Sequence, residues 1–386
     1  MGNKVKLLVK LILLSTIPTL LLWLPFALKL ESFWGIPLPK DGMATVVANY
    51  DGPLFIVVAK TLYNVEQIKN LVSFALPAEY YAAHFPLFPI LIRVFSPLLG
   101  YPYAMISVTL LSSILATYFF YLYARGKTNA QNALWLTLIF SILPARWLIV
   151  KSVGSSEPLF MAATIASIYY FDKKKFLASG IWGALAQLTR SIGGLLFVAY
   201  ALYIIYTGFR NLATINTKQI FKGFNVKKYF GLLLIPLALL LLFCFYKIQY
   251  NDFYAYFNSG DNIHLFFPPF QVFNYSASWV GTFWLEEIIF VYILAFMGLT
   301  KLIKKEGGIA SWYTGLFFLV LIFISHRDIV RYALPVVPFL LVGWSDTLNT
   351  KEFKWLTLAL IIPIYLFSLA FISQNVMPIS DWAGLL

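Results

Sequence analysis

Asp51 is an isolated carboxylate between two apolar segments, in the sequence Tyr50-Asp51-Gly52-Pro53. Gly52 and Pro53 favour a turn, and proline suits the first residue of a helix, so Asp51 or Gly52 would lie in the N-cap region of that helix. Aspartate is a common helix cap, and spacing alone favours this structural role. A carboxylate here could instead act as a general base toward a sugar or lipid hydroxyl.

His84 and Arg93 flank a second segment of interest, Phe85-Pro86-Leu87-Phe88-Pro89. Its two prolines predict a rigid, kinked chain. His84 has two interpretations, a side chain hydrogen-bonded to backbone or a group that takes part in chemistry. Arg93 lies in an apolar segment, where an unpaired guanidinium is unfavourable, so we expect it to pair with an acid or a phosphate.

Charged side chains at the ends of apolar runs form a third group. Its members are Glu157, Arg190, Arg327 and Arg331. Any one of them could be a structural anchor whose charged end reaches the membrane surface. Several arginines that converge opposite acids favour an anionic ligand, because the planar guanidinium fork matches a phosphate.

The composition shows which elements must position these side chains. Of 386 residues, 60% are hydrophobic and only 12% are charged, against about 25% in soluble domains. Apolar runs such as Leu7 to Leu30 approach or exceed the roughly 20 residues of a membrane-spanning helix. We therefore predict an all-α, polytopic membrane protein, in which the net charge of +13 reflects basic cytoplasmic loops rather than a nucleic-acid partner.

The apolar runs predict eleven transmembrane helices in a single integral-membrane domain over residues 1–386, with no separate soluble domain. The predicted spans are 7–28, 103–124, 130–149, 157–171, 176–189, 191–207, 229–247, 282–300, 309–325, 332–348 and 354–373. With the N-terminus inside and the C-terminus outside, most basic residues lie on the cytoplasmic side, as the positive-inside rule requires. Residues 86–99 suit an interfacial or re-entrant helix.

Two predicted non-cytoplasmic segments, residues 31–102 and 248–281, are too long to be simple connections. Both mix aromatic residues with isolated charges, which favours short amphipathic helices at the membrane surface. We expect the functional residues to lie there and at the adjoining helix ends. One cysteine, Cys244, and three histidines provide no disulfide framework and no recognisable zinc pattern.

The order of these motifs resembles one family, the polytopic GT-C glycosyltransferases similar to GPI mannosyltransferase 2. Tyr50-Asp51-Gly52 with Tyr63 resembles the family's Trp-Asp-Gly box and later Tyr, and His84 to Arg93 resembles its Phe-Pro-Leu-x-Pro segment. Asn251-Asp252 with Ala255 and Phe257 resembles its Gly-Asp-Pro-x-Ala-Phe segment. Three further segments match in order, Ser156-Glu157, Leu188-Thr189-Arg190 and Arg331-Tyr332. The chain departs from the pattern at Tyr50, which replaces Trp, at Ser191, where Pro is common, and at His84, where an aromatic residue is usual.

The resemblance implies a GT-C architecture and a hexose donor, typically mannose, linked to polyprenyl or dolichyl phosphate. It implies transfer with inversion to a glycan or lipid-linked acceptor on the non-cytoplasmic face of a bacterial or archaeal plasma membrane or the endoplasmic reticulum. Besides these substrates, we expect contact only with membrane lipids. No cofactor is needed, although a divalent ion between Asp41 and Asp51 is an alternative.

The predicted roles follow from this reaction. Asp51 is the expected general base, since inversion needs a base opposite the leaving phosphate. The expected phosphate ligands are Arg190, Arg331 and Arg93. The expected substrate-binding residues are Tyr50, His84, Glu157, Asp252 and Tyr332, with Glu157 either orienting an arginine or binding the acceptor.

A transporter or flippase of a lipid-linked sugar is the main alternative from another class, because it would also need membrane-embedded arginines. Transporters usually place polar residues near the membrane midplane, whereas these charges gather at the outer ends of spans. That position favours a transferase at the membrane surface. A purely structural subunit would leave the convergent charges unexplained.

Overall fold

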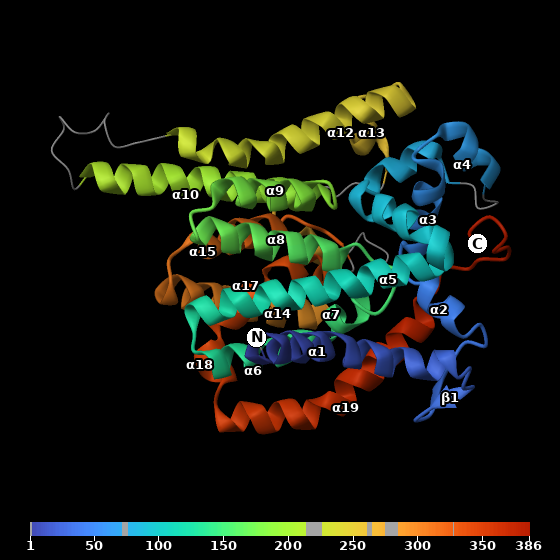
Figure 1. The fold of residues 1–386 in the computed structure, drawn as a ribbon, viewed down its shortest axis with the longest axis horizontal. Coiled ribbons are helices and arrows are strands. Elements are labelled where there is room, and N and C mark those ends of the chain that lie inside the picture. Colours follow the sequence, from blue (N-terminus) through green and yellow to red (C-terminus); the bar gives the residue numbers. More distant parts are fainter. Residues whose placement is uncertain (1, 72–75, 214–225, 261–264, 275–284, 327) are drawn as a thin grey trace.

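The computed structural model describes residues 2–71, 76–213, 226–260, 265–274, 285–326 and 328–386. The longer helices are α1 (Gly2–Ala27), α5 (Leu87–Lys127), α6 (Ala130–Ile142), α8 (Glu157–Asp172), α9 (Phe176–Gln187), α10 (Gly194–Ala213), α12 (Leu234–Tyr250), α14 (Leu285–Lys305), α15 (Ile309–Leu321) and α19 (Lys351–Gln374). Figure 1 shows these helices side by side with similar axes, from α10 and α12 at one edge to α1 and α19 at the other. The structure confirms an all-α fold.

Shorter elements connect these helices. They are α2 (Met43–Val47), α3 (Gly52–Thr61), α4 (Val65–Leu71), η1 (Ala78–Ala83), α7 (Ala145–Val150), η2 (Ser191–Gly193), η4 (Val226–Leu233), α13 (Ala255–Asn258), η5 (Gln271–Phe273), α16 (Ile329–Tyr332), η6 (Leu334–Val336), α17 (Val337–Gly343) and α18 (Ser345–Leu348). Every predicted span overlaps at least one helix. Among the described residues, five helices are long and apolar enough to cross a membrane, namely α1, α5, α10 with η2, α12 with η4, and α19.

The predicted helix at residues 86–99 is the first part of α5. Gly100 has φ 72° and ψ 158°, which interrupts the helical backbone between this part and the predicted span 103–124. Glycine adopts positive φ without the steric penalty of a Cβ atom. The sequence therefore predicted two helical segments correctly, and Gly100 provides the break between them.

The long segment 31–102 differs from its prediction in two respects. A small antiparallel hairpin, β1 (Ser32–Phe33) with β2 (Ile36–Pro37), pairs Ser32 with Pro37 and Phe33 with Ile36. Helix α3 was expected to lie amphipathically on the membrane surface, but residues 52–59 are all buried. A short helix that is apolar on every face is stable only inside the protein, so α3 is part of the core that carries the catalytic candidate Asp51.

Glycines of α9 pack closely against η4 and the start of α12. A Cβ atom added to Gly180 would lie 1.8 Å from the carbonyl oxygen of Gly231, and one added to Gly183 would lie 2.4 Å from Ile235. Small residues at membrane helix interfaces permit such close approach, which increases dispersion contact where lipid supplies no hydrophobic drive.

We predict that Gly180→Ala destabilises the protein by about 1–3 kcal/mol, because the new methyl group overpacks this contact. The measurement is the thermal unfolding midpoint in detergent. Gly126→Ala is the matched control, because a Cβ atom at this helical glycine meets nothing within 4 Å. Equal midpoints for the two variants would contradict the proposed close packing.

Candidate functional site

Asp51 occupies the N-cap position of α3, but its side chain forms no capping hydrogen bond. Instead, Oδ2 lies 3.2 Å from Nη2 of Arg331, and about a third of the side chain is exposed. The capping interpretation, which spacing alone favoured, is therefore wrong for the carboxylate. The side chain is held by an ion pair from a segment 280 residues further along the chain.

The turn before α3 sets the direction of this carboxylate. Tyr50 adopts φ 49°, a left-handed conformation that is unusual for a bulky residue. Gly52 follows, and a Cβ atom there would lie 2.4 Å from the carbonyl oxygen of Val47. Only glycine therefore lets α3 begin directly against α2. The sequence predicted a turn at this position, and the structure adds the steric reason for it.

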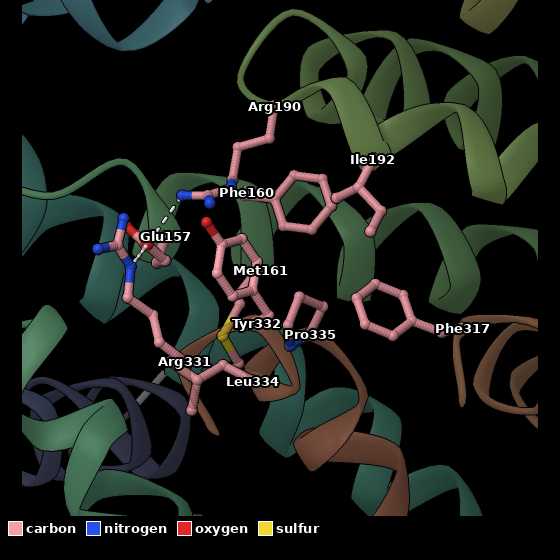
Figure 2. Close-up of a pocket in the computed structure, with 10 residues that line it drawn as sticks. All are labelled: Glu157, Phe160, Met161, Arg190, Ile192, Phe317, Arg331, Tyr332, Leu334 and Pro335. Atoms are coloured by element: carbon pink, nitrogen blue, oxygen red, sulfur yellow. Dashed lines mark hydrogen bonds and ion pairs between the residues drawn. The ribbon is translucent and has the colours of Figure 1, made fainter. Parts of the chain in front are cut away.

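Glu157 is a buried carboxylate at the first residue of α8, and two arginines meet on one of its oxygens. Its Oε1 lies 2.6 Å from Nε of Arg331 and 2.8 Å from Nη1 of Arg190, while the Ser155 hydroxyl donates to Oε2. Figure 2 shows both arginine side chains reaching toward Glu157. Of the two roles predicted for Glu157, the contacts favour orientation of the arginines.

The loop before Glu157 is fixed by α1. The Lys151 ammonium donates to the Ser15 carbonyl at 2.8 Å, and the Trp23 indole donates to the Ser152 carbonyl at 2.6 Å. These bonds satisfy polar groups that the buried loop would otherwise leave unpaired. The position of Glu157 thus depends on helix α1, although the two are far apart in the sequence.

A second ion-pair group, which the sequence analysis missed, adjoins the first. Arg146 contacts Asp328 at 3.3 Å (Nε to Oδ1) and donates through Nη1 to the Tyr50 hydroxyl at 3.1 Å. Asp328 also lies 4.0 Å from Arg331, whose guanidinium carbon is 4.3 Å from the centre of the Tyr50 ring. Burial, with help from the Asp328 charge, raises the pKa of the Tyr50 phenol, so its hydroxyl stays protonated.

Arg146 and Asp328 could have been found by the criterion that selected Glu157, a charged side chain at or near the end of an apolar run. Arg146 lies near the end of a predicted span, and Asp328 is three residues from Arg331. The network as described joins Arg146, Arg190 and Arg331 to Asp51, Glu157 and Asp328. Three positive and three negative side chains balance, so the group carries no net charge.

A narrow pocket of about 10 Å³ lies beside the two arginines of Glu157. Its lining residues are Glu157, Phe160, Met161, Arg190, Ile192, Phe317, Arg331, Tyr332, Leu334 and Pro335. Among the contacts of the described residues, Arg190 uses only Nη1, and its other N–H donors remain for a ligand. The arrangement suits an anionic group with an apolar attachment.

The remaining predicted residues lie in different surroundings. Arg93 was expected to pair with an acid or a phosphate; among the described residues its Nη1 instead donates to the carbonyls of Ala59 and Lys60 at 2.9 and 2.8 Å. These carbonyls end α3, where the helix dipole attracts a cation. Asp252 accepts from the Tyr254 amide and the Asn258 side chain, and it forms no ion pair within the described residues.

His84 and Tyr332 lie nearer to the network. His84 is buried, with its ring 5.0 Å from that of Phe55, and the charges of Asp51, Arg190 and Arg331 act on it. Tyr332 lines the pocket beside Arg331. Arg327 lies outside the described residues. No group of three His, Cys, Asp or Glu side chains gathers in the described ranges, so the Asp41–Asp51 metal alternative gains no further ligand.

No known family model matches the chain, and no curated protein matches its sequence. Among solved structures, it resembles ArnT from Cupriavidus metallidurans bound to undecaprenyl phosphate, with a TM-score of 0.58 and 13% identity over 90% of this chain and 62% of that one. The same protein in the apo state gives 0.53 and 14% over 81% and 58%. The chain thus spans about three fifths of the neighbour's length.

These likenesses define the class of the molecule. The chain is an all-α, multi-pass membrane protein with a GT-C-like fold, as the sequence predicted. At this level of identity the likeness concerns the fold, so the site must be interpreted from its own residues.

We predict that Glu157→Gln lowers the stability by about 3 kcal/mol, because it leaves two partly buried guanidinium groups without their shared carboxylate. Thermal unfolding in detergent measures the effect. Glu79→Gln, at an exposed glutamate, is the control. A Glu157→Gln midpoint equal to that of the control would show that the carboxylate does not hold the arginines.

We also predict that His84→Phe reduces the sensitivity of stability to acid. Burial, together with Arg190 and Arg331, lowers the pKa of His84 below its ordinary value of 6.5, while Asp51 opposes the shift. The unfolded chain therefore binds a proton at higher pH than the folded chain, and stability falls as the pH drops below about 6.5. Unfolding midpoints at pH 7.5 and 5.5 test this; equal pH dependence in both proteins would refute it.

Proposed function

We propose that this protein is an inverting membrane glycosyltransferase that moves a hexose, expected to be mannose, from a polyprenyl or dolichyl phosphate donor to a glycan or lipid-linked acceptor. The observation that carries the proposal is the convergence of Asp51, Glu157, Arg190 and Arg331 in one ion-pair network beside a pocket. The undecaprenyl phosphate bound by the structural neighbour ArnT supports a polyprenyl phosphate as the donor's carrier.

Asp51 is the proposed general base. In direct inversion the acceptor oxygen forms a bond to the anomeric carbon while the bond from that carbon to the phosphate oxygen breaks. The acceptor's hydroxyl proton passes to the Asp51 carboxylate, and the lipid phosphate leaves with one additional negative charge. The 3.2 Å contact with Arg331 holds the Asp51 carboxylate in position beside the proposed donor site.

Arg190 and Arg331 are the proposed ligands of the leaving phosphate. Preorganised cations stabilise charge that develops in the transition state, and the protein around them has already been ordered by Glu157. Charge-assisted hydrogen bonds from a guanidinium to phosphate are among the strongest available. Arg93 stays a predicted phosphate ligand, although its Nη1 donates to carbonyls at the end of α3.

The order of contacts suggests how the two substrates approach. Arg331 lies between Asp51 on one side and Glu157 with Arg190 on the other. The pocket is lined by Arg190 and Arg331 but not by Asp51. We therefore assign the side of Arg190 and Arg331 to the donor phosphate, and the exposed side of Asp51 to the acceptor, so that the two substrates reach opposite faces of the sugar.

Finer assignments rest on the resemblance to GPI mannosyltransferase 2. This resemblance is supported by the fact that residues from its separate motifs lie together. Tyr50, Glu157 and Tyr332 lie in or beside the network that contains Arg190 and Arg331. Asp252 remains a predicted substrate ligand of the second long loop. The non-cytoplasmic location of the site rests on the positive-inside rule.

The decisive prediction concerns Asp51→Asn, measured as transfer from polyprenyl-phosphate-mannose to a panel of glycan and glycolipid acceptors in nanodiscs. We expect turnover to fall by about 10²–10⁴-fold, the usual contribution of a general base, while donor binding persists. A transporter or flippase would give no transfer product and would be little affected by this change.

Asp41→Asn is the matched control, because Asp41 is an exposed carboxylate ten residues before Asp51. It should keep wild-type turnover. If both variants lost activity to the same extent, the two-aspartate metal alternative would replace the general-base assignment. Near-normal turnover of Asp51→Asn would remove Asp51 from the chemistry.

A further inference from the structure

A large apolar groove lies far from the ion-pair network, between α1, α6 and α19. Its volume is about 780 Å³, and Figure 1 shows its three helices at one edge of the molecule. Representative wall residues are Leu13, Ile17, Leu134, Leu138, Ile361 and Ile364. The first half of α19 is mostly exposed and stands away from its neighbours, for example with Trp355 72% exposed. In a bilayer, an apolar groove of this size is open to lipid chains, which are as apolar as its walls.

The length of the groove matches one leaflet of a bilayer. Along α1 its lining runs from Lys10 to Leu21, and along α19 from Lys354 to Tyr365. At 1.5 Å per residue each wall is about 16 Å long, close to half of the roughly 30 Å hydrocarbon thickness. At the inner end, the Tyr365 hydroxyl donates to the Leu21 carbonyl at 3.1 Å and joins the two helices.

The end of the groove at the predicted cytoplasmic membrane surface is basic. Lys10 and Lys354 line it together with the polar side chains of Gln131 and Asn132, and none of the described lining residues is acidic. The Lys354 ammonium lies 5.6 Å from the centre of the Trp135 ring. Lysine and tryptophan together are typical of the level of lipid headgroups.

This end is opposite to the proposed active site. The ion-pair network meets α19 near its C-terminal end, where the Arg146 guanidinium lies 4.0 Å from the centre of the Phe371 ring. Lys354 belongs to the first turn of the same helix. The groove therefore differs from the side of Arg190 and Arg331 that we assign to the donor phosphate.

We propose that this groove binds an anionic glycerophospholipid of the adjacent leaflet, with its phosphate between Lys10 and Lys354 and an acyl chain along the apolar walls. The length of the groove fits one leaflet-spanning chain, and the uncompensated pair of lysines fits a negative headgroup. The bound lipid fills the space between α19 and the rest of the bundle and so stabilises the helix packing.

The test is binding of phosphatidylglycerol to the purified full chain, measured by native mass spectrometry and by the rise in unfolding midpoint on lipid addition. Phosphatidylcholine and undecaprenyl phosphate are the comparison lipids. We expect Lys10→Ala with Lys354→Ala to weaken phosphatidylglycerol binding about 10- to 30-fold, since each lysine near an anionic surface contributes several-fold. Wild-type protein should prefer phosphatidylglycerol to both other lipids.

Lys4→Ala with Lys6→Ala is the matched control, because it removes the same number of charges from α1, one of the groove's helices, at positions outside the groove lining. It should change binding less than 3-fold. Leu138→Trp fills the groove and should reduce binding while both lysines remain, which keeps the test valid if the double lysine variant does not fold. Equal loss in the control pair, equal binding of phosphatidylcholine, or tighter binding of undecaprenyl phosphate would each overturn the proposal.

Discussion

The Glu157 carboxylate is buried at the start of α8, and a buried charge is stable only when it is paired and hydrogen-bonded. Arg331, Arg190 and Ser155 meet this requirement from three directions. Because Arg190 follows α9 and Arg331 lies within α16, pairing this one carboxylate fixes the relative positions of α8, α9 and α16. Asp51 is then drawn to Arg331 and brings α3 into the same contact.

The packing around Glu157 also helps to keep its buried carboxylate paired with the arginines. The loop before Glu157 is held against α1 by hydrogen bonds from the side chains of Lys151 and Trp23 to backbone carbonyls. Gly52 allows α3 to start where a side chain would collide with α2. Close packing and satisfied polar groups therefore hold four distant segments within ion-pair distance, which is what a preorganised electrostatic site requires.

Charge separates the molecule into two ends with different proposed partners. At one end, arginines with an apolar pocket face a proposed phosphate-linked donor, and a nearby carboxylate faces the acceptor. At the other end, two lysines stand over an apolar groove without any acid in its described lining. Paired arginines suit a ligand that must be oriented, whereas unpaired lysines suit a headgroup that only needs to be attracted.

Composition and apolar runs by themselves determined the membrane class and the helical segments. They also indicated most charged members of the site, because a charge in lipid is so unfavourable that charged residues in or beside apolar runs are rare and easily recognised. Tertiary structure decided which of these residues meet. It placed Arg93 on a helix end, added Arg146 and Asp328 to the network, and buried α3. These outcomes depend on contacts between segments far apart in the chain, and no local pattern of residues encodes which distant partner neutralises a given charge.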